Sequence, residues 1–128
     1  MEIVREFWSC GVESLDIHCR SLDDDGYLGA EFTVSDGRVR VFFGDTGLAM
    51  GWAIVRHRKG YVFVEAFSSL DSGGGVESEV TFTLLTEDVL QARMARVIRF
   101  AELNPMSTEA EELKRLRDAL SLYRGNNL

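Results

Sequence analysis

The 128-residue chain is acidic and otherwise has the composition of an ordinary globular protein. Its hydrophobic fraction of 45% and charged fraction of 27% argue against global disorder. Its formal net charge of −7 argues against nucleic acid as a partner, because phosphate binding depends on Lys and Arg. We therefore expect a single domain over residues 1–128, mostly β in 1–85 and with a helical pair in 86–124.

The chain opens with MEIVREFW, which lacks the basic and apolar regions of a signal peptide. No apolar run is long enough to span a membrane. These features predict a cytoplasmic protein without a membrane association, whose cysteines are reduced. The spacing of Cys10 and Cys19 leaves a bridge between them open, so the role of the two cysteines is not fixed.

The first part of the chain alternates with the period of β-strands. We predict a strand over residues 2–9 and another over 12–20, where Leu15, Ile17 and Cys19 share one face. The run Asp23-Asp24-Asp25-Gly26 then breaks the pattern. A calcium loop built on it lacks the required Glu at its twelfth position, so an ordinary Asp/Gly turn is predicted.

The clearest hairpin signal is Asp36-Gly37, which is typical of a type I′ turn. The register that follows places apolar pairs on one face: Val34 with Val39, Phe32 with Val41 and Ala30 with Phe43. The opposite face is nearly all polar, so register and burial agree.

The central stretch 48–68, LAMGWAIVRHRKGYVFVEAFS, predicts a second hairpin. We place Arg58-Lys59-Gly60 in a three-residue loop, because the closing position of such a loop favours glycine. The predicted cross-strand pairs are His57 with Tyr61, Val55 with Phe63 and Ala53 with Glu65. Both faces are largely apolar, so the hairpin needs cover on each side.

After a predicted strand over residues 77–85, the period becomes helical from Thr86. The first helix carries an apolar arc and, largely opposite to it, an arginine row of Arg93, Arg96 and Arg99. It ends at Asn104-Pro105. The second helix begins with a capping box, in which Thr108 is followed three places later by Glu111.

The second helix has a narrow apolar seam, whose members are Leu113, Leu116, Leu120 and Tyr123. This seam predicts an antiparallel helix pair on the sheet, or alternatively a homodimer contact. The fold class we predict is α+β: an antiparallel β-meander of six or seven strands, open or curled into a partial barrel, followed by two C-terminal helices.

No set of catalytic or metal-binding residues is recognisable in the sequence. His18 and Cys19 are adjacent in a predicted strand, so their side chains point to opposite faces. Neither histidine has a zinc-site spacing, and phosphate-loop and dinucleotide-binding motifs are missing. We therefore assign no catalytic residue and no cofactor.

Two charged surfaces remain as candidates for partner binding. Arg56, His57, Arg58 and Lys59, beside Tyr61, form a basic cluster that suits an acidic partner or an anionic ligand, or simply keeps a turn soluble. Residues 1–37 hold nine acids against two bases, with Asp23, Asp24 and Asp25 at their densest point. Such an asymmetry suits the steering of a charged partner, or it is simply a solvated surface of mixed charge.

These observations favour a small acidic protein-binding module that occludes a basic partner protein. In size and acidity the chain resembles the immunity and antitoxin proteins that bacteria make against basic toxins. One alternative is a small-ligand-binding domain, or an unrecognised hydrolase or isomerase, with a pocket between sheet and helices lined by Trp52, Phe63 and Met94. Another is a dimeric secretion chaperone that uses the helix seam.

Overall fold

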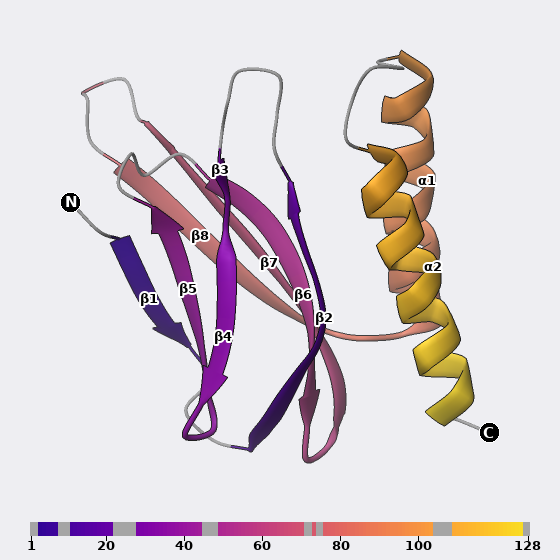
Figure 1. Ribbon diagram of the computed structural model, residues 1–128, viewed down its shortest axis with the longest axis horizontal. Helices are drawn as coiled ribbons and strands as arrows, with labels where there is room; N and C mark the ends of the chain where they lie inside the picture. The colour runs from indigo at the N-terminus through magenta and orange to yellow at the C-terminus, as the bar shows by residue number, and fades with distance from the viewer. Residues whose placement is uncertain are drawn as a thin grey trace. The chain divides into compact units, whose positions relative to one another are not determined.

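The computed structural model describes residues 3–7, 11–21, 28–44, 49–70, 73, 76–103 and 109–126. The chain divides into two compact units, Met1–Leu84 and Leu85–Leu128. The first contains the strands and the second contains two helices (Figure 1). The predicted α+β class, with mainly antiparallel sheets followed by two C-terminal helices, is confirmed. That both units form one domain stays a prediction.

The described residues of the first unit form eight strands: β1 Ile3–Phe7, β2 Val12–Ser21, β3 Leu28–Gly29, β4 Glu31–Ser35, β5 Arg38–Gly44, β6 Ala49–His57, β7 Gly60–Leu70 and β8 Val76–Leu84. They make a three-stranded sheet of order β1-β5-β4 and a five-stranded sheet of order β2-β6-β7-β8, in which β3 pairs with β6. Chain neighbours form the hairpins β4–β5, β6–β7 and β7–β8. The strands β1 and β2 instead pair with β5 and β6, far along the sequence.

The β4–β5 hairpin has the predicted turn and register. Asp36 and Gly37 have φ angles of 55° and 77°, as a type I′ turn requires. Val34 pairs with Val39, and Phe32 is likewise opposite its predicted partner. This register puts the apolar side chains of both strands on one face.

The predicted register of the β6–β7 hairpin is wrong by one residue. His57 pairs with Gly60 and Val55 with Val62, so the turn consists of Arg58 and Lys59 alone. Gly60, at φ 135°, is the first residue of β7 and not the last residue of the loop. Because both faces of this hairpin are apolar, the hydrophobic pattern does not distinguish the two registers.

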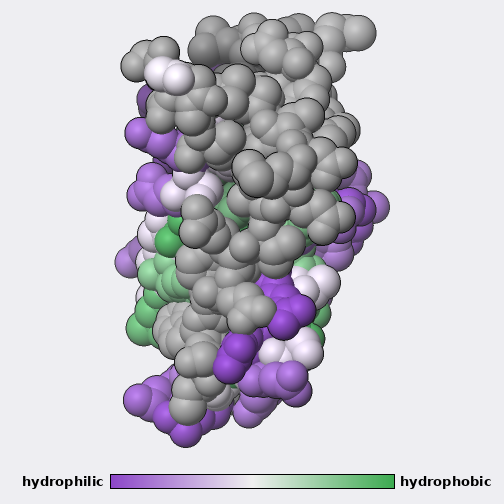
Figure 2. All heavy atoms as spheres, turned by 90° about the vertical axis from the view of Figure 1, so that its left-hand side faces the viewer, coloured by the Kyte–Doolittle hydropathy of each residue, from purple (hydrophilic) through white to green (hydrophobic). Residues whose placement is uncertain are grey.

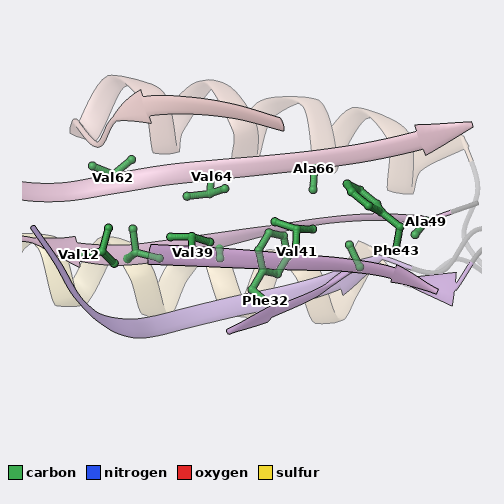
Figure 3. Packing of buried hydrophobic residues seen from close by; sticks show 12 residues of the cluster. Val12, Phe32, Val39, Val41, Phe43, Ala49, Val62, Val64 and Ala66 are labelled. Carbon is green, nitrogen blue, oxygen red and sulfur yellow. The ribbon is translucent and has the colours of Figure 1, made fainter. Parts of the chain in front are cut away.

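The core of the first unit lies between its two sheets (Figure 3). The three-stranded sheet contributes Phe32, Val39, Val41 and Phe43, and the five-stranded sheet contributes Val12, Ala49, Ala53, Val55, Val62, Val64 and Ala66. On the other face of the three-stranded sheet, Thr33 and Arg40 are exposed. This outer face is therefore mostly polar, although Phe42 lies on it and is partly buried.

The central hairpin β6–β7 of the five-stranded sheet is largely buried on both faces, as its sequence predicts. Trp52, Ile54 and Phe63 lie on the face opposite to the core cluster and are at most 1% exposed. The rings of Trp52 and Phe63 stack with their centroids 5.4 Å apart. These aromatic side chains are part of the interior.

The second unit is an antiparallel helix pair, α1 Glu87–Leu103 and α2 Glu109–Asn126. Thr86 caps α1: its hydroxyl accepts a hydrogen bond from the N–H of Val89 at 3.2 Å. Ion pairs of Glu87 with Arg124 and of Arg93 with Glu112 join the two helices. Arg93 therefore does not belong to an exposed arginine row. The predicted cap at Thr108 lies outside the described residues.

Candidate functional site

Basic side chains gather where the two hairpin turns of the first unit lie. The β4–β5 and β6–β7 turns are at the same end of this unit, the lower end in Figure 1. We call this end, with the exposed side chains of Arg38, Arg56, Arg58 and Lys59, the hairpin end. Figure 2 shows hydrophilic side chains at the lower end of the view and also along its two sides.

Arg56 is held between an aromatic ring and a carboxylate. Its guanidinium carbon lies 5.6 Å from the centroid of the Tyr61 ring. Its Nε lies 4.0 Å from Oε2 of Glu13, and these two side chains are 51% and 55% exposed. An exposed pair of this kind contributes at most about 1 kcal/mol, so the carboxylate compensates the arginine charge only weakly.

Hydrogen bonds to His57 and Gly11 hold the backbone of the β6–β7 turn in place. His57 is buried, and its Nδ1 accepts a hydrogen bond from the N–H of Lys59 at 3.2 Å. The N–H of Arg58 donates to the carbonyl of Gly11 at 2.8 Å. A Cβ on Gly11 would lie 2.8 Å from Nε2 of His57, so glycine permits this close approach. His57 thus positions the turn while Arg58 and Lys59 face solvent.

Tyr61, predicted to lie beside the basic cluster as part of the partner-binding surface, is an interior residue. It is 8% exposed, and its hydroxyl has no hydrogen-bond partner among the described residues. Of the five predicted residues, Arg56, Arg58 and Lys59 remain on the surface. Arg38 joins them through the fold, and the sequence signal for it was its place directly after the Asp36-Gly37 turn.

At the opposite end of the first unit lie the ends of β2, β3, β6, β7 and β8 that are far from the hairpin turns. We call this end the loop end. The pairs Ser21 with Met50, Leu28 with Ala49 and Leu70 with Val76 bring these ends together. The segments 22–27, 45–48 and 71–75 lie between them in sequence and contain Asp but no Lys or Arg. The predicted partner-binding residues Asp23, Asp24 and Asp25 fall in the first segment, outside the described residues.

The excess of acidic over basic residues in the chain comes from residues whose side chains the structure does not describe. Acidic and basic side chains are equal in number among the side chains that the structure describes. The remaining charged residues are Glu2, Glu6, Asp23, Asp24, Asp25, Asp45, Asp71 and Glu102, against Arg5 alone. The net charge of −7 is therefore carried outside the described side chains.

Two acids on strand β8 are not among the binding residues predicted from the sequence. Glu77 and Glu79 are exposed and alternate with partly buried residues on the last strand of the five-stranded sheet. The signal was present in the alternating sequence VESEVTFTL. Its importance depends on β8 being a sheet edge, which the sequence does not reveal.

The described residues contain no group of three His, Cys, Asp or Glu side chains placed to hold a metal ion. His18 is exposed and Cys19 is buried, as expected for neighbours in a strand, whereas Cys10 lies outside the described residues. None of the described helices is long and apolar enough to cross a membrane.

The two alternative functions depend on the helix seam and on the predicted ligand pocket. Leu116 of the helix seam is fully buried within the chain, and the other seam members are partly buried. A dimer through this seam stays a prediction. For the predicted ligand pocket, Trp52 and Phe63 are buried in the first unit and Met94 belongs to the second. The pocket likewise stays a prediction.

Comparison of the chain with known proteins finds no matching family model, no matching curated protein and no matching solved structure.

Proposed function

We propose that this protein is a small protein-binding module that occludes a basic partner protein, as immunity and antitoxin proteins do. In this proposal the loop end meets the partner, and Asp23, Asp24 and Asp25 contact its basic cleft. The proposal includes the cytoplasmic location expected from the sequence.

The observation that supports the proposal is the separation of charge along the first unit. Three segments with acids and no bases connect strand ends at the loop end. At the hairpin end the bases Arg38, Arg56, Arg58 and Lys59 outnumber the acids Glu13 and Asp36. Such a distribution orients a charged partner and raises its association rate. Nearby apolar side chains would supply most of the affinity.

The first experiment identifies the partner and tests the charge dependence together. The tagged protein is incubated with host lysate, washed at low and then high salt, and the eluted proteins are identified by mass spectrometry. The association rate of the purified partner is then measured over a range of salt concentrations.

Two triple variants show whether the association rate depends on the position of the negative charges or only on the net charge of the protein. The first is Asp23→Asn, Asp24→Asn, Asp25→Asn. The second, Asp16→Asn, Asp36→Asn, Asp118→Asn, removes the same charge from exposed positions elsewhere. We expect the first variant to slow association at low salt by about tenfold and to reduce its salt dependence, and the second to change it little.

Equal effects of the two variants would reject the loop end as the binding surface. Recovery of a small molecule in place of a protein partner would favour the ligand-binding alternative.

A further inference from the structure

Strand β8 is an edge of the five-stranded sheet, and it differs from the other described edges. It pairs with β7 from Val76 to Leu84 without a register shift. At the opposite edge β2 has two register shifts; in the other sheet β1 has one and β4 is five residues long. Bulges and short strands protect an edge from pairing with another chain. Among the described strands, β8 is thus the long and regular edge.

One face of β8 is acidic at the half nearest the loop end. Glu77 and Glu79 are exposed and share this face because side chains alternate along a strand. Glu79 pairs with Phe67 of β7, which is 44% exposed. A strand added beside β8 would place its own alternate side chains opposite the two carboxylates.

The other face of β8 is apolar. Val80 and Phe82 are partly buried and pack against the core cluster of the first unit. Leu84, on the same face, is 65% exposed. Apolar side chains on an added strand would extend this face and cover Leu84.

We propose that β8 binds an extended segment of the partner as an additional strand, with Lys or Arg at alternate positions and apolar residues between them. This inference rests on the proposed function, since a basic partner docked at the loop end would present its chain beside Glu77 and Glu79. Main-chain hydrogen bonds to the outward-facing groups of β8 supply affinity. The two carboxylates select the basic side chains.

The test uses a synthetic heptapeptide of alternating Lys and Val. Hydrogen exchange of the intact protein is followed with and without this peptide. We expect alternate amides of β8 to exchange about tenfold more slowly when the peptide is bound, while amides of β2 at the opposite edge stay unchanged. A peptide with the same number of Lys residues and a central Pro carries the same charge but lacks a donor, and it should give no protection.

Surface variants test the charge selection without disturbing the fold. Glu77→Gln with Glu79→Gln should weaken binding of the Lys/Val peptide by about tenfold, because it removes two exposed ion pairs. The matched control, Asp16→Asn with Asp36→Asn, removes the same charge elsewhere on the first unit and should change binding less than about twofold. Hydrogen exchange of the β8 amides in each variant without peptide checks that strand β8 still pairs with β7.

Each outcome separates this inference from the proposed function. Unchanged β8 exchange, or equal binding of the Pro-containing peptide, would reject strand addition even if the partner still depends on Asp23, Asp24 and Asp25. Protection of β8 with a partner that ignores those three aspartates would support strand addition and reject the loop end as the docking surface.

Discussion

The ion pair between Arg93 and Glu112 joins the two helices and is largely protected from solvent. Nε and Nη2 of Arg93 both donate to Oε1 of Glu112, at 2.9 and 2.7 Å. The two side chains are 24% and 9% exposed. We predict that Arg93→Met destabilises the protein because it leaves the Glu112 carboxylate buried without this partner.

The size of the effect follows from the exposure of the pair. Removing one partner of a fully buried pair costs about 3–5 kcal/mol. Since Arg93 retains some contact with water, we expect a loss of about 2–3 kcal/mol in the free energy of unfolding. The double variant Arg93→Met, Glu112→Leu removes both charges and keeps apolar volume, so it should recover to within about 1 kcal/mol of the parent.

Urea unfolding followed by far-UV circular dichroism measures these changes. Arg99→Met is the control, because Arg99 is an exposed arginine on the same helix. We expect the control to stay within about 0.5 kcal/mol of the parent. If Arg93→Met costs no more than Arg99→Met, or if the double variant is as unstable as Arg93→Met, then the unpaired Glu112 carboxylate is not the cause of the destabilisation.

Three further substitutions test local features of the structure. Gly37→Ala should lower the free energy of unfolding in urea by about 1 kcal/mol, because φ is 77° at this position. Gly29→Ala should cost more, about 3 kcal/mol in the same assay, since the new Cβ would lie 2.1 Å from Cβ of Arg20 and 2.9 Å from its Cα. Arg124→Gln should raise the pKa of Glu87, measured by NMR titration, because the hydrogen bond and charge of Arg124 hold the pKa of that carboxyl below its usual value. A carboxyl with a lowered pKa stabilises the folded state above its unfolded pKa and loses this contribution as the pH falls through its folded pKa. The parent should therefore lose more stability on acidification than Arg124→Gln does.

A contrary result for any of these variants would identify the structural feature that is wrong. A neutral Gly37→Ala would mean that the turn relaxes to another type. A Gly29→Ala variant as stable as the parent would show that β2 and β3 separate without cost. An unchanged Glu87 titration would mean that the Arg124 contact is not populated in solution.

Local sequence signals predict the parts of this fold in which one face is polar and the other apolar. Around Asp36-Gly37 the turn residues and the burial pattern of the flanking strands specify the same register. In the β6–β7 hairpin, Trp52 and Val55 lie on opposite faces and both are fully buried. A shift of one residue there still puts apolar side chains on both faces, so the sequence does not determine the register.

Contacts between segments far apart in the sequence could not be predicted from it, for a different reason. The pairing of β2 with β6, and the partner of Arg93 on the other helix, depend on which segments meet in space. The same applies to the two charged ends and to the position of β8 at a sheet edge. Alternation shows that Glu77 and Glu79 share a face, but it does not show what lies beside that strand.

The pairing of early strands with late ones sets the order in which the protein can fold during synthesis. β1 and β2 are synthesised before β5 and β6, which are their pairing partners. The hairpins β4–β5 and β6–β7 join neighbouring segments and so close at low entropic cost, whereas docking of the first two strands closes long loops. A growing chain therefore carries β2 unpaired until Ala49–His57 has left the ribosome.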